Sequence, residues 1–417
     1  MVSKPSAFRA FGHRNYRVLF PANVLSNIGT WAQRIAQDWL VLELTNSAQL
    51  LGIITALQFL PSLLLSLYGG VLADRFDKRS LLVITNVGAG LGSLTLGLLV
   101  LSGQVQVWHV ALLAFTVGVF SALDAPVRTS FNSELVGQKD IPSAISLNSA
   151  NFNAGRLIGP AASGFLIVLF GTGLSFVINS FTYLAVVISL LMIRKGELFI
   201  SVKPERSAKL KEAVNYVLSH TEIRLVMIAV FFATTFGLNF QIFMAVMATQ
   251  EFGKGPAEFG ILGSILAIGS FTGVLVSAKL EHLRVPKWVM RFGMGFGSLL
   301  MVTAWMPSYG SFAAILPFVG GMALMMLIGA NSFVQTNCEP TLRGRVMGIY
   351  LMIFMGGTPI GSPAIGWFAE NFGVRITVFI CGLIVLIAAV VIAIVIKRSP
   401  GPEPKTESLP VITDPQN

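Results

Sequence analysis

Apolar residues occur in long, nearly uninterrupted stretches that are separated by short polar connections. A helix that crosses the roughly 30 Å hydrocarbon core of a bilayer needs about 20 predominantly apolar residues. Twelve stretches approach or reach this length, six in each half of the chain, at residues 18–42, 50–72, 81–101, 108–123, 144–169, 174–193, 223–248, 259–280, 289–306, 312–333, 346–369 and 374–396. This pattern predicts an all-α membrane protein with twelve transmembrane helices in two six-helix pseudo-repeat halves.

The two halves repeat each other in part of their sequence. Residues 128–171 match residues 330–373 without gaps, and Gly159 falls on Gly361 in this match. Parallel repeats of this kind are typical of transporters, whose substrate site lies between the halves near the middle of the membrane.

These patterns divide the chain into four parts. We expect an N-terminal six-helix half (1–193), a cytoplasmic linker (194–222), a C-terminal six-helix half (223–398) and a disordered cytoplasmic tail (399–417). Apolar residues at helical spacing over 208–219 predict a short amphipathic helix within the linker.

The composition supports lipid as the surrounding medium. Only 12% of the residues are charged and 54% are apolar, whereas a soluble domain carries about 25% charged residues. The net charge of +10 does not indicate nucleic-acid binding, because the basic residues form short clusters between the apolar stretches and no compact patch with aromatics between them.

The positions of lysine and arginine predict the orientation. If the N-terminus is cytoplasmic, only Lys254 and Arg375 of the 29 basic residues lie outside, Arg34 and Arg156 lie within spans, and the remaining 25 are cytoplasmic. Lysine and arginine accumulate in cytoplasmic loops of membrane proteins. Both termini and the linker are therefore predicted to be cytoplasmic.

The connection between the second and third spans carries the most specific motif. It reads Gly70-Val-Leu-Ala-Asp74-Arg75-Phe-Asp77-Lys78-Arg79 and resembles the G-x-x-x-D-R-x-G-R-R motif of the major facilitator superfamily. We call Gly70, Asp74, Arg75, Asp77, Lys78 and Arg79 the cytoplasmic gate motif. By this resemblance its charges form a network that holds one conformation of the transporter.

Two residues qualify this interpretation. Asp77 stands where the superfamily has glycine, and because Asp accepts positive φ more readily than most residues, we expect the turn to be preserved. Asp124, at the end of the fourth span, is the expected partner of the network, and a solvated acid at a helix end is the alternative.

The fifth span carries a second motif. The sequence Gly155-Arg-Leu-Ile-Gly159-Pro160-Ala-Ala-Ser-Gly164 resembles the antiporter motif G-x-x-x-G-P-x-x-G-G of the same superfamily, with Ser163 in place of one glycine. A proline bends a membrane helix and frees a carbonyl group, and small residues let helices cross closely. We therefore expect antiport, with generic close packing as the alternative.

The first span has an unusual polar face. Its polar residues recur at spacings of three or four, which places them on one side of a helix: Asn23, Asn27, Thr30, Arg34 and Asp38. Charges within a span are costly and usually mark function. Arg34 and Asp38 can pair along the helix, and Asp38 is the candidate proton-binding group, with Arg34 as its coupling partner. A structural ion pair is the alternative.

Residues 29–45 resemble the branch of the superfamily that holds bacterial siderophore and macrolide exporters, and the resemblance extends to about Arg398. It implies the major facilitator fold, a monomer in the bacterial plasma membrane, and proton-coupled efflux by alternating access. A small or amphipathic molecule such as a drug or siderophore is the expected substrate, with protons and the lipid bilayer as the other partners. Import of a small metabolite and a transporter-like sensor are the alternatives.

Other chemistries lack a sequence signal. An ATP-driven pump needs a Walker sequence, which is absent, and the spans contain no nucleophile cluster, paired carboxylates or metal ligands. Cys338 and Cys381 are too few for a disulfide framework. We expect no enzyme activity, cofactor or metal.

Several polar residues within the spans are candidates for lining a substrate cavity, with interhelical hydrogen bonding as the alternative. They are Asn27, Thr30, Asn151, Asn239, Gln241 and Asn331.

Overall fold

The computed structural model describes residues 8–199, 210–280 and 285–398. Every regular element in these ranges is helical. The first half comprises η1 (Arg9–Gly12), α1 (Arg14–Thr45), α2 (Ala48–Arg75), α3 (Lys78–Leu101) and α4 (Val107–Leu191). The second half comprises α6 (Thr221–Phe232), η3 (Ala233–Gly237), α7 (Phe240–Val246), η4 (Met247–Glu251), α8 (Pro256–Lys279), α9 (Pro286–Ala304), α10 (Tyr309–Asn337), α11 (Arg343–Phe372) and α12 (Val374–Arg398).

The long helix α4 consists of three spans that follow one another with two interruptions. Gly137 (φ 67°) and Gly171 (φ 77°) interrupt it with left-handed backbone conformations, which glycine adopts without a Cβ clash. Eight helical stretches in the described chain, α4 among them, are long and apolar enough to cross a membrane. With α4 counted as three and with α1 and α9 included, the predicted set of twelve spans is confirmed.

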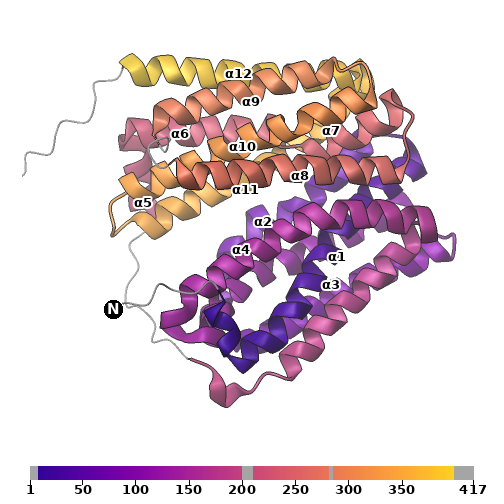
Figure 1. Ribbon diagram of the computed structural model, residues 1–417, viewed down its shortest axis with the longest axis vertical. Coiled ribbons are helices and arrows are strands. Elements are labelled where there is room, and N and C mark those ends of the chain that lie inside the picture. Colours follow the sequence, from indigo (N-terminus) through magenta and orange to yellow (C-terminus); the bar gives the residue numbers. More distant parts are fainter. Residues whose placement is uncertain (1–7, 200–209, 281–284, 399–417) are drawn as a thin grey trace, which may run out of the picture.

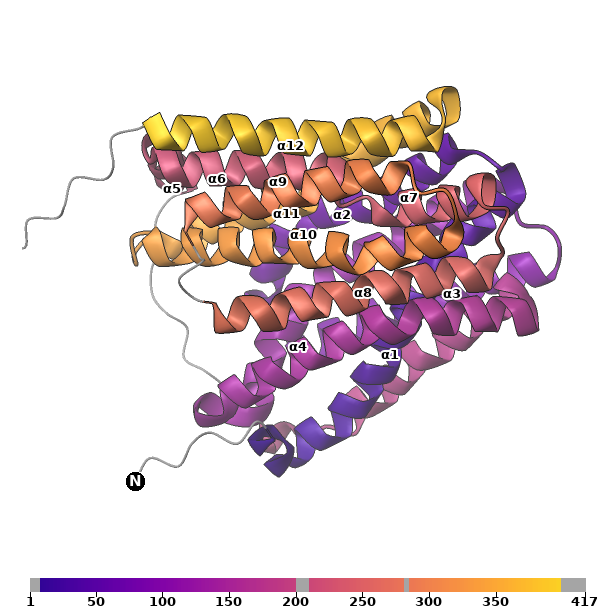
Figure 2. The same ribbon diagram turned by 45° about the horizontal axis from the view of Figure 1, so that its top comes forward.

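The helices form two bundles that differ in sequence range (Figures 1 and 2). Helices α1 to α4 make one bundle and α6 to α12 the other, while α2 packs against α11 and α4 against α8 where the bundles meet. Between the bundles, η2 (Lys195–Glu197) and α5 (Leu210–Ser219) belong to the linker, and α5 lies within the range where a short helix is predicted. The tail 399–417 lies outside the described residues.

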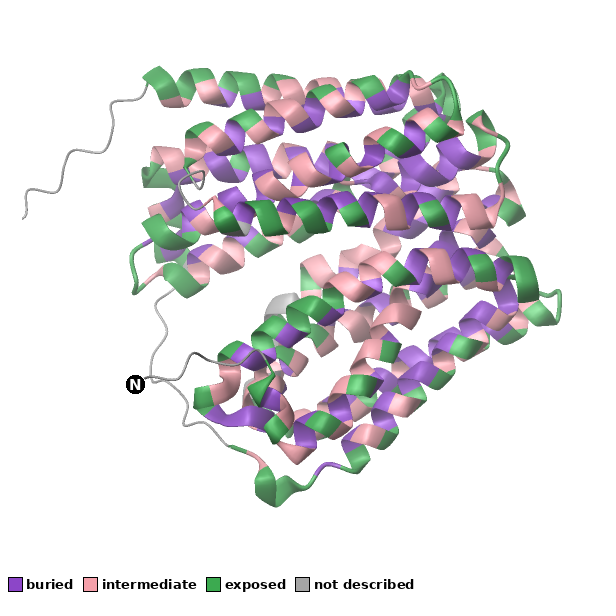
Figure 3. Cartoon of the chain, viewed as in Figure 1, coloured by how far each residue is buried: buried purple, intermediate pink, exposed green. Residues whose placement is uncertain are grey.

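The outer faces of the bundles expose large apolar side chains. On α12, Ile376, Ile387 and Val391 are 46%, 51% and 52% exposed, and Figure 3 shows exposed residues along the outward faces of the helices. Such continuous apolar exposure is unfavourable in water and suits a helix surrounded by lipid, because its backbone polar groups are satisfied internally.

Candidate substrate and coupling site

A polar cavity of about 300 Å³ lies within the first bundle, between α1, α3 and α4. It runs from Arg34, near the middle of α1, toward helix ends that the sequence places on the cytoplasmic side. Three of the predicted cavity residues, Asn27, Thr30 and Asn151, line it together with Arg34.

Two of these residues also join helices. The Asn27 side-chain amide donates to the Asn151 carbonyl at 2.7 Å, and the Thr30 hydroxyl lies 3.1 Å from the Tyr183 hydroxyl. Both pairs connect α1 to α4. The wall of the cavity and the packing of the bundle therefore depend on the same polar groups.

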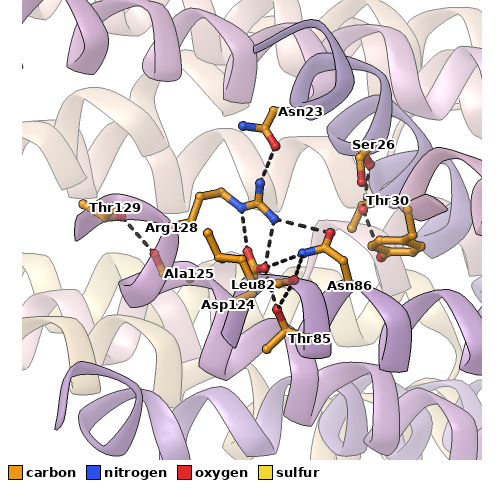
Figure 4. A network of polar contacts seen from close by, with 11 residues as sticks. Asn23, Ser26, Thr30, Leu82, Thr85, Asn86, Asp124, Ala125, Arg128 and Thr129 are labelled. Atoms are coloured by element: carbon orange, nitrogen blue, oxygen red, sulfur yellow. Dashed lines mark hydrogen bonds and ion pairs between the residues drawn. The ribbon is translucent and has the colours of Figure 1, made fainter. Parts of the chain in front are cut away.

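The largest charged feature of the cavity is an ion pair on α4 (Figure 4). Arg128 donates to Asp124 through Nε at 2.6 Å and through Nη2 at 2.9 Å. The Thr85 hydroxyl and the Asn86 amide of α3 each donate to Asp124 Oδ1 at 2.9 Å. Arg128 also donates to Asn23 of α1. This network ties three helices together around a fork-like pair of hydrogen bonds.

The network corrects two sequence interpretations. Asp124 is paired with Arg128 on its own helix, and not with the cations of the cytoplasmic gate motif. Arg128, counted among the cytoplasmic cations, lines the cavity instead. The sequence interpretation ended the fourth span at residue 123, whereas the helix continues to Gly137. The signal for this pair was available in the four-residue spacing of an acid and an arginine.

The described side chains of the gate motif make contacts within the first bundle. Lys78 forms a 2.5 Å ion pair with Glu134, and Arg79 donates to the Leu190 and Leu191 carbonyls at 2.7 and 2.8 Å. Arg75 is exposed at the end of α2. The side chains of Gly70 and Asp74 lie outside the described residues, so the predicted charge network at Asp74 remains a prediction.

Asp77 has a different role from the one predicted. Its φ is −61°, so the position requires no left-handed conformation, and Asp77 is the N-cap of α3. It accepts hydrogen bonds from the Ser80 hydroxyl and backbone amide at 2.6 and 3.2 Å. These two bonds hold the pKa of Asp77 below its usual range, and the bond from the Ser80 hydroxyl has the larger effect. Asp is a preferred N-cap because its side chain satisfies free amides of the first turn.

Arg34 and Asp38 lie on one helix but do not pair. No ion pair joins them in the described chain. The Arg34 guanidinium carbon lies 4.6 Å from the ring centroid of Trp31 and 5.1 Å from that of Phe59. Asp38 is 2% exposed, and its Oδ2 accepts no hydrogen bond from any described residue. The predicted ion pair is therefore not formed in this conformation, although the two charges interact electrostatically along the helix.

The antiporter-type motif lies at close helix crossings. A Cβ at Gly159 would lie 2.9 Å from the Ile28 carbonyl oxygen of α1, and one at Gly155 would clash with Asn27. A Cβ at Gly164 would lie 2.8 Å from the Pro256 carbonyl oxygen of α8, in the other bundle. A Cβ at Gly260 of α8 would in turn clash with the carbonyl oxygen of Pro160. The motif therefore packs α4 against α1 and against the second bundle.

A polar contact joins the bundles at the ends of α2 and α11. The Glu370 carboxylate of α11 accepts from the Ser47 hydroxyl and from the Gln49 amide, the latter at 2.8 Å. Ser47 is the N-cap of α2, so a side chain of one bundle helps to cap a helix of the other. We call this the Glu370 contact.

The remaining candidates lie in the second bundle and do not line the described cavity. Asn239 is 3% exposed and donates to the Thr235 carbonyl at 2.8 Å, at the break between η3 and α7. This bond stabilises the break locally. Gln241 and Asn331 are half-buried.

Comparison with known proteins identifies relatives over nearly the full chain. Residues 5–413 match the family model described as transmembrane secretion effector. The staphyloferrin A transporter of Staphylococcus aureus is 26% identical over 88% of this chain and 92% of its own length. The multidrug efflux pump Tap of Mycolicibacterium fortuitum is 24% identical over 90% and 93%. The enterobactin exporter EntS of Shigella flexneri is 21% identical over 85% of each chain.

Solved structures show the same fold. A bacterial homolog of the human lysosomal transporter Spinster, in an inward-facing and unoccupied conformation, has a TM-score of 0.74 at 15% identity and covers 94% of this chain and 97% of its own. A D-xylose–proton symporter has a TM-score of 0.70 at 14% identity, with 90% and 97% covered.

Proposed function

Since the chain belongs to the transmembrane secretion effector family of major facilitator superfamily transporters, we propose that it exports a small molecule across the bacterial plasma membrane in exchange for protons. It is a secondary transporter and not an enzyme. The observation that carries the proposal is the polar, charged cavity inside the first bundle. Intramembrane ionisable residues that face a cavity mark substrate and proton pathways.

The contacts between the bundles support alternating access. Gly164 and Pro256, and Glu370 and Ser47, bring the bundles together at one end, whereas the bundles diverge toward the end where the linker lies (Figure 1). If the linker is cytoplasmic, the described state faces inward. Export then requires the Glu370 contact to break and the opposite ends to approach.

The orientation gives a first prediction. Gln104 and Lys211 are exposed at opposite ends of the helices, and Cys338 and Cys381 are buried. A membrane-impermeant thiol reagent is expected to label Gln104→Cys in intact cells and Lys211→Cys only after permeabilisation, because lysine and arginine accumulate on the cytoplasmic side. Labelling of Lys211→Cys from outside intact cells contradicts the orientation.

Proton exchange gives the second prediction. Everted membrane vesicles that contain the protein build an inward-acid pH gradient, which a pH-sensitive fluorescent dye reports. We expect at least one compound of a panel of organic anions, cationic dyes and macrolides to dissipate this gradient, because its uptake into the vesicle releases protons. Vesicles without the protein are the control. Compounds that cross without moving protons contradict the coupling, and absence of any protein-dependent flux favours a sensor.

A further inference from the structure

Two arginines near the middle of the first bundle are not bound by an acidic side chain of the described residues. Arg34 of α1 lines the cavity, and Arg156 of α4 lies on the same aromatic ring, with its guanidinium carbon 5.8 Å from the Trp31 centroid. Neither arginine forms an ion pair with any residue in the described part of the chain. Both guanidinium groups are thus within about 6 Å of one ring centroid, the range of a cation–π contact.

Unpaired cations are unusual at this depth. Charged groups within membrane spans normally pair with one another or with backbone carbonyls, since a lone charge there is costly. Arg128 follows this rule, because Asp124 binds it through two hydrogen bonds. The remaining acid of the region, Asp38, is buried away from the cavity. Asp38 interacts with Arg34 through space along α1, but no described carboxylate binds the guanidinium, so Arg34 lines the cavity with its hydrogen-bond donors free of an acidic partner.

The cavity wall suits a ligand rich in oxygen. Besides Arg34, side-chain amides and hydroxyls line it, including Asn27, Thr30 and Asn148. A guanidinium offers two parallel N–H donors that match a carboxylate, and amides and hydroxyls can bind hydroxyl or carbonyl groups. A lipophilic cation would instead meet like charge in this cavity.

We propose that the exported substrate is an organic anion whose carboxylate binds Arg34, with Arg156 close by, and whose hydroxyl or carbonyl oxygens bind the amides of the cavity. The inference rests on the proposed function and names the substrate class of the same site. Arg34 is then a substrate-binding residue and not the partner of Asp38.

The test is a binding measurement on the full chain in lipid nanodiscs. Citrate is the probe, because it carries carboxylates and a hydroxyl and no apolar body, and its uncharged triethyl ester and the cation tetraphenylphosphonium are the comparisons. We expect citrate, and neither comparison, to raise Tm as a ligand of the native state does. Arg34→Gln is expected to weaken citrate binding at least tenfold, since it removes a charged hydrogen-bond donor from the carboxylate.

The chain offers a matched control. Arg291 of α9 stacks on Trp288 at 4.4 Å but is exposed in the second bundle, so Arg291→Gln should bind citrate as the wild type does. If Arg34→Gln does not fold, Arg34→Lys is tested in its place, because lysine keeps the positive charge but lacks the planar guanidinium with its two parallel donors. Arg34→Lys should also weaken citrate binding.

Two outcomes overturn the proposal. One is citrate binding that Arg34→Gln and Arg34→Lys leave unchanged, and the other is binding of tetraphenylphosphonium without binding of citrate. Export of a cationic dye without citrate binding would leave the proposed efflux function intact and remove the anion specificity. Citrate binding at Arg34 without gradient-driven flux would support the anion specificity and contradict the proposed efflux function.

Discussion

Proteoliposomes that contain Asp38→Asn are expected to exchange substrate across the membrane but not to concentrate it. With the membrane potential clamped and one proton exchanged per molecule, a pH difference of one unit supports about a tenfold concentration ratio. The wild type should approach that ratio, and the variant should stay near one. Radiolabelled substrate measured inside and outside the vesicles gives the ratio directly.

The physical reason lies in the surroundings of Asp38. The carboxyl is 2% exposed and its Oδ2 accepts no hydrogen bond from any described residue. A buried ionised carboxylate without partners is costly, and binding a proton removes that cost. Proton binding is therefore linked to the conformation that buries this part of α1. Asparagine keeps the shape of the neutral acid but has no proton to release.

A second acid on the same helix provides the control. Glu43 is exposed near the end of α1, and Glu43→Gln should concentrate substrate as the wild type does. Unchanged accumulation by a well-folded Asp38→Asn protein rules out the coupling role. Failure of Asp38→Asn to fold indicates that Asp38 has a structural role instead.

Asp124→Asn is expected to cause the largest loss of stability. Removing one partner of a buried ion pair costs about 3–5 kcal/mol, because the other charge remains without compensation. The side chains of Arg128 and Asp124 are 21% and 18% exposed, so we expect a loss near 3 kcal/mol, together with reduced transport. Unfolding in mild detergent, followed by tryptophan fluorescence, measures the change.

Two controls distinguish the effect of the lost charge from an effect on packing. Asp124→Asn with Arg128→Gln should recover part of the loss, because neither charge is then left alone. The Arg194–Glu197 pair is 63% and 41% exposed, and Glu197→Gln should cost no more than about 1 kcal/mol. Equal effects of Asp124→Asn and Glu197→Gln would show that the network contributes nothing beyond a surface ion pair.

Hydropathy located all twelve spans, but it ended the fourth too early. The predicted span stops at residue 123 because charged residues follow, whereas the helix continues through Asp124 and Arg128. These charges are tolerated because they neutralise each other and bind Thr85 and Asn86 of α3. Residues so distant in sequence do not affect the local hydropathy. The end of the fourth span could therefore not be predicted without knowledge of the tertiary contacts.

The first span shows the opposite error. The four-residue spacing of Arg34 and Asp38 permits an ion pair, and sequence alone suggested one. In the folded protein the Arg34 guanidinium contacts Trp31 and, from α2, Phe59. A favourable spacing on one helix cannot predict which group of a neighbouring helix competes for the side chain. Of the predicted polar face, Asn23, Asn27, Thr30 and Arg34 line the cavity, whereas Asp38 does not.

The cavity belongs to one copy of a duplicated unit. Its lining residues all fall between Asn23 and Tyr183, while the second copy supplies the surface against which α2 and α4 pack. After such a duplication, substitutions that change the substrate can accumulate in one copy, while the other copy keeps the surface on which the two bundles pack. Descendants of this chain can therefore diverge in what they carry through a few exchanges in α1, α3 and α4, while the glycine crossing between α4 and α8 and the packing of α2 on α11 are retained.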